Sequence, residues 1–577
     1  MPPAIEQLPN EPLLHHILRH FPAHPRHVLV RDAKNAVAAD CSQLLRDMLH
    51  MRRQMRRTLP PCMFDAQGRI DSERPYVIIL APGNYDFVVA ALATLACGGA
   101  FAPVATTLSP EEVCLLLEMT KASCILFSPQ YRTLASQTTD HYYTTRNKPG
   151  DSVHIVEITQ AQKPDHTNPD TDSDPEIQIN PEMQLDPKDP GVLMFTSGTT
   201  GPPKGVVRPR NLWYGSPSEF SVPHVAMNFR EPHWITVTMS MIQMVLAGLR
   251  IEIIEDSPQA IWEMFAQRRV TYFCAMPVTW AELMRYFRDN LDGLHHAKRR
   301  RYIDGVCALQ RAVVVGAVSW PAVMQFWKEL LGRPLANMYG STEVAPATVT
   351  TDDSDPSLER CIGKPWSGVR VKLSEGDHGE ILLKSPDMFT HYIGNEAATQ
   401  AAVDEQGYYK TGDFGHLVGD QYVIDGRSST DFIPYYSLRV PVHEVEARLV
   451  DLPYICEAYV VSATFQYKEH IAALVRLTPA TMPATTSTTT ISLEQVRSDL
   501  QEKLQRYKLP TLLRVLQAHE RVPETRTGKP IRKKIQEVFF SLVEEEPLPG
   551  EVECCQRSET LGMMPGTRRA WDWAGME

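Results

Sequence analysis

Short runs of hydrophobic residues alternate with longer amphipathic stretches along most of the chain. The runs are rich in β-branched and aliphatic residues and lie at 76–82, 123–129, 192–198, 249–255 and 312–318. Runs of this length between turn residues are typical of buried strands, and the longer stretches have the length of helices. Because alternating strands and helices build parallel sheets, the pattern predicts an α/β fold.

Residues 87–105 contain no charged side chain and are nearly long enough to span a bilayer. Gly98, Gly99 and Pro103 interrupt this stretch where a membrane helix needs continuity. We therefore expect a buried helix, a Gly-Gly turn and a strand, and no membrane span.

Three polar stretches lack hydrophobic periodicity. Residues 163–190 are rich in Pro, Asp and Asn, residues 478–490 are rich in Thr and Pro, and a polar tail follows Glu544. Such composition is typical of loops and tails rather than packed elements. We expect a surface loop, a solvent-facing insertion and a disordered tail, respectively.

Composition limits the class of protein. The chain has 577 residues with 43% hydrophobic and 22% charged side chains, so it can bury the cores of more than one domain. Its net charge of −11 argues against nucleic acid or an anionic lipid surface as the principal partner. Eleven cysteines without a CxxC pair, together with an N-terminus unlike a signal peptide and a C-terminus unlike an SKL address, favour the cytoplasm.

The segment TSGTTGPPKG, residues 196–205, directly follows a predicted strand. Its glycines let backbone N–H groups approach an anion, its hydroxyls add donors, and Lys204 adds a mobile positive charge. The order of residues differs from that of a Walker A loop, GxxxxGK[ST]. The loop is equipped to hold a polyphosphate, and the alternative is a flexible surface turn.

Further motifs follow this loop in a fixed order. They are NMYGSTEV (337–344), GYYKTGDFGHL (407–417), IDGR (424–427), LQRYKLP (504–510) and PETRTGKPIRKK (523–534). With the loop, this series resembles the adenylate-forming superfamily of acyl-CoA synthetases, nonribosomal adenylation domains and firefly-type luciferases. The resemblance covers about residues 36–543 and is closest to the acyl-CoA ligases.

The resemblance implies a set of nucleotide-binding residues, and their chemistry fits that role. Tyr339 can stack on a purine, Asp413 offers two acceptors to the ribose hydroxyls, and Arg427 can add donors to the same sugar. Thr342 can donate to the α-phosphate, and Glu343 can hold a Mg²⁺ ion that bridges phosphate oxygens. The full set of ATP-binding residues is Thr196, Ser197, Gly198, Thr199, Thr200, Lys204, Gly316, Ala317, Tyr339, Asp413 and Arg427.

Lys529 follows Thr527-Gly528 in the C-terminal region. It resembles the family lysine that moves into the active site and stabilises charge on the carboxylate and α-phosphate. The implied catalytic residues are therefore Lys529, Thr342 and Glu343. The alternative for Lys529 is a solvated member of the basic run that continues through Lys533 and Lys534.

The chain departs from the family between the two expected domains. The family pattern GRxKDxIxxxG becomes GRSSTDFIPYYS, residues 426–437, with one extra residue. The hinge position becomes Thr430 or Ser429, and hinges need torsional freedom more than one particular side chain. Ser437 replaces a glycine that in thioester-forming members lies close to the pantetheine arm, so its side chain puts acyl transfer in question.

Residues 233–249 occupy the region that walls the acyl pocket in the family. Met239, Met241 and Met244 fit either an adaptable apolar wall or ordinary core packing. No acidic residue lies between Trp234 and Leu249, whereas amino-acid-activating domains place an aspartate here. We expect an organic acid without an α-amino group as the substrate.

We therefore expect a large N-terminal domain, residues 1–426, of α/β subdomains with parallel sheets. A small mobile α+β C-terminal domain should cover residues 427–545, and a disordered tail residues 546–577. The predicted reaction uses ATP and Mg²⁺ to convert a carboxylic acid into an acyl-AMP and transfers the acyl group to coenzyme A. The alternatives are transfer to the phosphopantetheine of a carrier protein and a catalytically silent nucleotide-binding protein.

Overall fold

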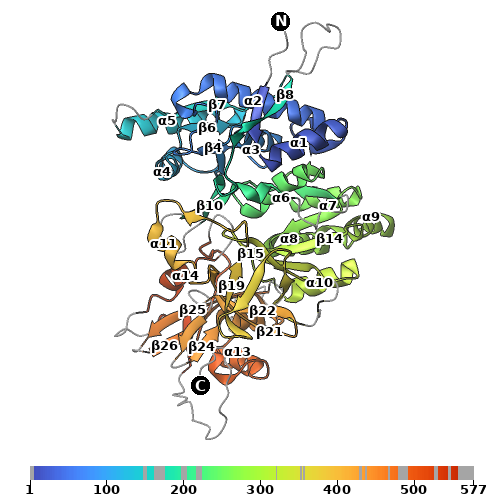
Figure 1. Ribbon diagram of the computed structural model, residues 1–577. Coiled ribbons are helices and arrows are strands. Elements are labelled where there is room, and N and C mark those ends of the chain that lie inside the picture. The colour runs from blue at the N-terminus through green and yellow to red at the C-terminus, as the bar shows by residue number, and fades with distance from the viewer. Residues whose placement is uncertain are drawn as a thin grey trace.

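The computed structural model describes residues 6–146, 152–161, 176–196, 204–215, 224–319, 321–350, 354, 358–427, 432–435, 438–465, 468–478, 491–524, 530–542 and 548–555. These parts form sheets and helices arranged along one long axis, with the N-terminal half at one end and the C-terminal part at the other (Figure 1). The predicted α/β class is confirmed.

The N-terminal end is built on a sheet whose strand order, among the described residues, is β20-β10-β9-β5-β4-β6-β7. Strands β5, β4, β6, β7 and β9 run parallel to their neighbours in this set, and β10 runs antiparallel to β9 and β20. The strands are β4 (Tyr76–Leu80), β5 (Ala100–Pro103), β6 (Cys124–Phe127), β7 (His154–Glu157), β9 (Pro190–Thr196), β10 (Lys204–Pro209) and β20 (His391–Tyr392).

Helices cover both faces of this sheet. Val77 and Ile79 of β4 pack in one cluster with α2 (Cys41–Thr58) and α3 (Tyr85–Ala96), while Tyr76, Ile78 and Leu80 pack with α4 (Pro110–Thr120) and α5 (Arg132–Arg146). Because successive side chains of a strand point to opposite faces, a strand covered on both sides needs hydrophobic residues at every position. This explains the uninterrupted hydrophobic runs in the sequence.

The uncharged segment forms the expected helix, turn and strand. Helix α3 has 12 residues, whereas about 20 are needed to span a bilayer. The Asn84 side chain caps its start by accepting from the N–H of Phe87, and Gly98 with a φ of +78° ends the following turn before β5. In the described part of the chain, no helix is long and apolar enough to cross a membrane.

A second, larger sheet connects the middle of the chain to the C-terminal part. Its parallel strands, from β2 through β12, β11, β13 and β14 to β15, are followed by antiparallel strands beginning at β16. The strands are β2 (Val28–Asp32), β3 (Val37–Asp40), β11 (Val225–Asn228), β12 (Arg250–Ile253), β13 (Tyr272–Ala275), β14 (Arg311–Val315), β15 (Ala336–Ser341), β16 (Ala345–Val349), β17 (Cys361–Pro365), β18 (Arg370–Leu373), β19 (His378–Lys384), β21 (Tyr409–Val418) and β22 (Gln421–Arg427).

Five helices flank the parallel part of this sheet. They are α6 (Ile235–Leu246), α7 (Pro258–Ala266), α8 (Pro277–Tyr286), α9 (His296–Cys307) and α10 (Pro321–Leu331). Trp262, Trp280 and Trp327 form the centre of this core, where the rings of Trp280 and Trp327 meet edge to face with centroids 4.7 Å apart. Two further helices, α1 (Pro12–Ala23) and α11 (Glu396–Ala401), lie outside it.

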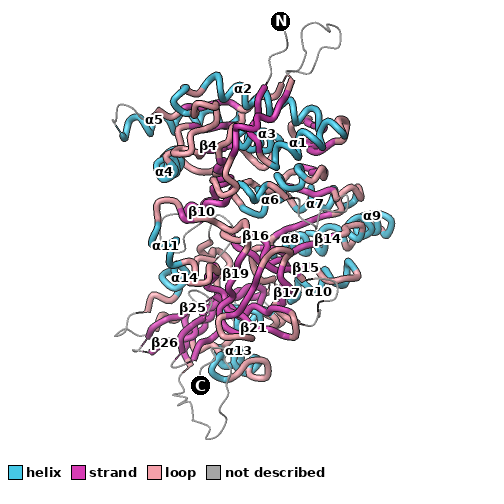
Figure 2. The backbone as a smooth tube through the Cα atoms, in the orientation of Figure 1, coloured by secondary structure: helices cyan, strands magenta, loops and turns pink. Residues whose placement is uncertain are grey.

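Strands gather in the C-terminal part of the molecule, around β19, β21 and β25 (Figure 2). Strands β25 (Ile455–Phe465), β26 (Lys468–Leu477), β27 (Leu512–Val515) and β28 (Val552–Cys554) form one sheet, and β23 (Phe432–Tyr435) pairs with β24 (Leu438–Pro441). Helices α12 (Val442–Val450), α13 (Leu493–Leu500) and α14 (Arg532–Phe539) accompany them. The expected insertion lies largely outside the described residues.

Two sequence predictions need correction. Part of the expected loop at 163–190 forms β8 (Ile177–Gln184), which pairs in parallel with β1 (Glu6–Asn10). Part of the expected tail forms β28, which pairs with β27. Both strands lie at the edge of small sheets and bury few side chains, so they need little hydrophobic periodicity and give a weak sequence signal.

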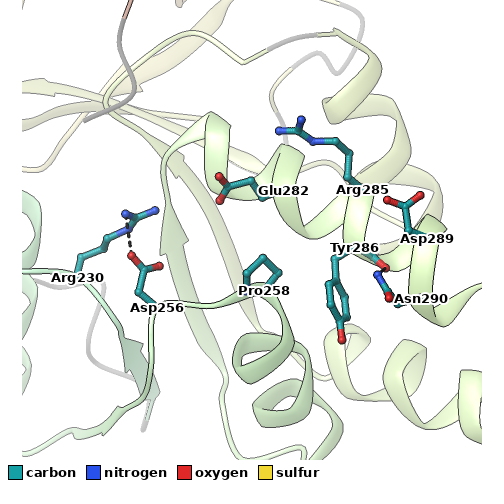
Figure 3. A pocket seen from close by; sticks show the side chains of 8 residues that line it. All are labelled: Arg230, Asp256, Pro258, Glu282, Arg285, Tyr286, Asp289 and Asn290. Atoms are coloured by element: carbon teal, nitrogen blue, oxygen red, sulfur yellow. Dashed lines mark hydrogen bonds and ion pairs between the residues drawn. The ribbon is translucent and has the colours of Figure 1, made fainter. Parts of the chain in front are cut away.

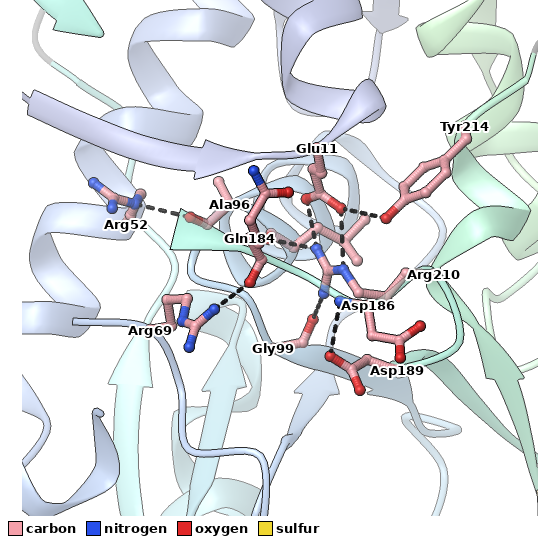
Figure 4. A network of polar contacts seen from close by, with 11 residues as sticks. Glu11, Arg52, Arg69, Ala96, Gly99, Gln184, Asp186, Asp189, Arg210 and Tyr214 are labelled. Atoms are coloured by element: carbon pink, nitrogen blue, oxygen red, sulfur yellow. Dashed lines mark hydrogen bonds and ion pairs between the residues drawn. The ribbon is translucent and has the colours of Figure 1, made fainter. Parts of the chain in front are cut away.

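A buried ion pair holds the N-terminal segment against the strand that leaves the predicted phosphate loop (Figure 4). Arg210 follows β10, and its guanidinium donates to both carboxylate oxygens of Glu11 at 2.6 and 3.0 Å. The same guanidinium donates to the carbonyls of Leu95 and Gly99, and the side chains of the pair are 0% and 1% exposed. These contacts fix the position of β10 relative to α3 and the Gly-Gly turn.

Candidate active site

The two ends of the predicted phosphate loop face each other on adjacent strands. Thr196 ends β9, Lys204 begins β10, and the two residues are directly opposite in the antiparallel register. The Thr196 hydroxyl donates to the carbonyl of Lys204 at 3.3 Å. The intervening residues 197–203, which include Ser197, Gly198, Thr199 and Thr200, lie outside the described parts of the chain.

Thr342 and Glu343 lie in the turn after β15, and neighbouring strands hold them from two sides. The carbonyl of Thr342 accepts from Nη1 of Arg208, a fully buried residue of β10, at 3.2 Å. Oε1 of Glu343 accepts from the Tyr392 hydroxyl at 2.7 Å, and Glu343 is 8% exposed. The turn is therefore fixed to the strand that carries Lys204.

Gly316, Ala317 and Tyr339 lie where parallel strands β14 and β15 end. Val315 pairs with Met338, so Gly316 and Tyr339 are the next positions on neighbouring strands. Gly316 has a φ of +86°, which favours glycine, and among the described residues a Cβ added there would meet only the Met276 side chain, at 3.9 Å. The described part of the chain therefore leaves room for a planar base beside this backbone.

Asp413 of β21 lies beneath this edge and is 6% exposed. Its Oδ2 accepts a hydrogen bond of 2.7 Å from the Tyr339 hydroxyl. Arg427 is opposite Asp413 in the register of β21 and β22, although its side chain is not among those described. The predicted base-stacking ring and the predicted ribose ligand are thus brought together.

The structure describes the neighbours of the predicted C-terminal residues but not these residues themselves. Lys529 lies in residues 525–529, outside the described chain, and the flanking Glu524 and Pro530 pair in a short β-bridge. Thr430, Ser429 and Ser437 also lie outside it. Their roles therefore stay predictions from the sequence.

The methionines of α6 belong to the hydrophobic core. Met239, Met241 and Met244 are 7%, 1% and 0% exposed and pack in the same cluster as α3. Of the two interpretations left open by the sequence, core packing is the one that the structure supports.

Two residues near the phosphate loop were not singled out from the sequence. Arg208 is a buried arginine that follows Val206 and Val207 in β10, and Tyr392 faces β10 from the short strand β20. Burial raises the pKa of the Tyr392 hydroxyl, and the neighbouring Glu343 adds to this effect, so the phenol stays a proton donor. A buried charged residue in a strand was the signal that could have identified Arg208.

A separate groove of about 430 Å³ lies between the N-terminal end of α7 and the C-terminal half of α8 (Figure 3). Its charged residues have both signs, and Arg230 pairs with Asp256 at 2.9 Å. None of the predicted site residues lines this groove. The region where β10 of the first sheet meets the turn after β15 of the second sheet, together with the ends of β14 and β21, is therefore the better candidate for the active site.

The donor set of this candidate site fits a magnesium ion bound with substrate phosphates. Within the described chain, no group of three or more His, Cys, Asp or Glu side chains could hold a metal. Mg²⁺ is commonly held by one or two carboxylates together with phosphate oxygens and water, so a single carboxylate is sufficient. Glu343 is the residue here that would hold it.

Comparison with known proteins gives consistent similarities. A family model described as AMP-binding enzyme matches residues 69–393. Acyl-CoA ligase oryP of Aspergillus oryzae is 32% identical over 545 residues, which cover 92% of this chain and 93% of that protein. The mitochondrial malonate–CoA ligase ACSF3 of Xenopus laevis is 25% identical, covering 80% of this chain and 83% of that protein.

Solved structures share the fold. ATP-bound MatB from Rhodopseudomonas palustris matches with a TM-score of 0.71 and 17% identity, covering 91% of this chain and 99% of that one. The AMP complex of the O-succinylbenzoate coenzyme A synthetase MenE from Bacillus subtilis matches with a TM-score of 0.70 and 19% identity, covering 92% and 99%.

Proposed function

The chain belongs to the AMP-binding enzyme family, and from this premise we propose that it is an ATP-dependent ligase that joins an organic carboxylic acid to coenzyme A through an acyl-AMP. The observation that carries the proposal is the arrangement where the two large sheets meet. Lys204, Glu343 and the Tyr339–Asp413 pair converge there from β10, the turn after β15 and β21. Curated relatives aligned over most of the chain are named CoA ligases.

Each group has a defined task in the first half-reaction. Asp413 binds the ribose hydroxyls, Tyr339 stacks on the adenine, and Lys204 binds the phosphate chain. Thr342 donates to the α-phosphate, and Glu343 would hold a Mg²⁺ ion, which would supply positive charge to the phosphate oxygens. The substrate carboxylate attacks the α-phosphorus, pyrophosphate leaves, and Lys529 stabilises the charge that develops there.

The second half-reaction exchanges AMP for a thiol. The sulfur of coenzyme A attacks the acyl carbon, and AMP leaves with the bonding electrons. We place this step after a rotation of a domain formed by residues 427–545. The ion pair between Glu359 and Arg448 crosses this boundary with side chains 55% and 26% exposed, and such exposed pairs resist rotation by only about 0–1 kcal/mol.

The acid carries no α-amino group in this proposal. The segment between Trp234 and Leu249 contains no carboxylate to hold an ammonium group. Its core-facing methionines add no polar group either. Aliphatic or aryl acids are therefore the proposed substrate class.

The cytoplasm is the proposed compartment. All eleven cysteines fall within the described residues and are free thiols, as a reducing environment requires. Fractionation of cells that express a tagged chain would test this placement.

An acid panel with mass-spectrometric detection tests the function. Purified protein, ATP and MgCl₂ should release pyrophosphate and form an acyl-AMP with at least one acid, and addition of coenzyme A should convert it to an acyl-CoA. Glu343→Gln is the matched control and should lose pyrophosphate release. If acyl-AMP accumulates and is not consumed when coenzyme A is added, coenzyme A is excluded as the acceptor. If no acid gives pyrophosphate release, the proposed ligase activity is excluded.

A further inference from the structure

The short strand β20 places a tyrosine between two groups of the proposed ATP site. Tyr392 pairs with Val206 and His391 with Val207 of β10, and the N–H of Ile393 donates to the Gly205 carbonyl at 2.8 Å. These backbone contacts begin one residue after Lys204. The position of Tyr392 is therefore tied to the end of the phosphate loop.

The same segment holds both the backbone and the side chain of Glu343. The N–H of Phe389 donates to the Glu343 carbonyl at 2.6 Å, and the Tyr392 hydroxyl donates to Oε1 at 2.7 Å. A hydrogen bond to a carboxylate is stronger than one between neutral groups and fixes the rotation of the carboxylate plane. Oε2 is then the oxygen not engaged by Tyr392 and is held in a constant direction.

The ring of Tyr392 also contacts Lys204. Nζ of Lys204 lies 5.3 Å from the ring centroid, within the range of a cation–π interaction. Tyr392 is 6% exposed, so water competes little on the buried side of the ring. One side chain therefore touches both the ammonium of the phosphate loop and the carboxylate after β15.

We propose that Tyr392 is a positioning residue for adenylation, which fixes the separation and direction of the Lys204 ammonium and the Glu343 carboxylate before ATP and Mg²⁺ bind. This inference rests on the proposed function, in which both groups bind the phosphate chain and its metal. Arg208 supports the arrangement from beneath, because it donates to the Thr342 carbonyl and is attracted by the charge of Glu343. Preorganised charges stabilise a transition state without a reorganisation cost during the reaction.

Tyr392→Phe tests the proposal because it removes the hydroxyl and keeps the ring. We expect the Mg²⁺ concentration for half-maximal pyrophosphate release to rise about 3–10-fold and the adenylation rate to fall roughly tenfold, the scale of losing one hydrogen bond to a charged group. The KM for the acid should stay unchanged. Transfer from supplied acyl-AMP to coenzyme A should keep its wild-type rate.

Tyr422→Phe is the matched control. Its hydroxyl donates to the Val371 carbonyl at 3.0 Å, and the residue belongs to the same hydrophobic cluster as Tyr392 without contacting Glu343. This variant should keep the wild-type dependence on Mg²⁺.

Three outcomes separate the inference from its premise. Wild-type Mg²⁺ dependence in folded Tyr392→Phe would overturn the positioning role, and so would an equal slowing of adenylation and acyl transfer. Absence of pyrophosphate release from the wild-type protein would instead overturn the proposed function. If Tyr392→Phe melts at a lower temperature, the double variant of Tyr392→Leu with Lys204→Met decides. Tyr392→Leu removes the ring, so effects of the two substitutions that multiply independently would contradict a link through the ring.

Discussion

The hydroxyl of Tyr339 donates a hydrogen bond of 2.7 Å to Oδ2 of Asp413, and this contact joins the end of β15 to β21. Asp413 is 6% exposed, so its carboxylate is largely removed from bulk water. The hydrogen bond holds the proposed ribose ligand and the proposed base-stacking ring as one unit. A change in either residue is therefore expected to affect ATP binding more than acid binding.

Asp413→Ala should reduce discrimination for the ribose hydroxyls. Wild-type protein should prefer ATP to 2′,3′-dideoxyATP by about 10–100-fold in kcat/KM, because the carboxylate accepts charge-assisted hydrogen bonds. The variant should lose most of this preference. Kinetics of pyrophosphate release with both nucleotides measure it, and an unchanged preference would place the ribose elsewhere.

Lys529→Ala should leave ATP binding nearly unchanged and slow adenylation by about a hundredfold or more, because a charge-stabilising donor is lost. Lys534→Ala is the control, since this exposed lysine of α14 belongs to the same basic run. Single-turnover formation of acyl-AMP is the measurement. Equal effects of the two substitutions would show that only the general positive charge matters.

Glu11→Ala should strongly destabilise the N-terminal sheet. Removing one partner of a buried ion pair leaves an uncompensated charge and costs about 3–5 kcal/mol. Asp304→Ala, in the exposed pair with Arg268, should cost less than about 1 kcal/mol. Urea unfolding compares the two variants, and similar small losses would contradict the importance of the buried pair.

His416 should make stability depend on pH. The hydrogen bond with Asp425 raises the pKa of His416 above 6.5, although burial opposes this shift. A histidine whose pKa is higher in the folded state than in the unfolded state contributes its full stabilisation at pH values below the unfolded-state pKa. This contribution is lost as the pH rises through the folded-state pKa. The free energy of unfolding should therefore fall on going from pH 6 to above that raised pKa.

Urea titrations of wild-type protein and His416→Gln check this dependence. In the variant, the free energy of unfolding should fall less steeply with pH over this range, because the contribution of His416 is absent. The same slope in wild-type and His416→Gln proteins would contradict the prediction.

The sequence predicted the elements whose packing requires hydrophobic periodicity. The strands at 76–80 and 311–315 and the helix Tyr85–Ala96 are covered on their faces by other elements, so their residue types follow directly from burial. Strand β8 was missed because its partner β1 lies far away in the sequence, with 171 residues between paired positions such as Glu6 and Ile177. Its pairing uses the backbone and requires few hydrophobic side chains.

The residues of the candidate site were predicted from motifs, whereas the residues that hold them in place were not predicted. The motifs point directly to residues with a proposed role in ligand binding, such as Glu343 and Asp413. Tyr392 and Arg208 act on those residues through contacts between distant segments, with 49 residues separating Tyr392 from Glu343. Only the folded chain brings such pairs together, so spacing in the sequence carries little information about them.

The pair between Glu11 and Arg210 has a consequence during synthesis of the chain. The two residues are 199 positions apart, so at about 5–20 residues per second the ribosome needs roughly 10–40 s to supply the arginine after the glutamate. Until then, α1 and α3 lack the guanidinium that joins Glu11 to the carbonyls of Leu95 and Gly99. The first sheet can close only after β9 and β10 have been made, which leaves the nascent N-terminal segment incompletely packed during this interval.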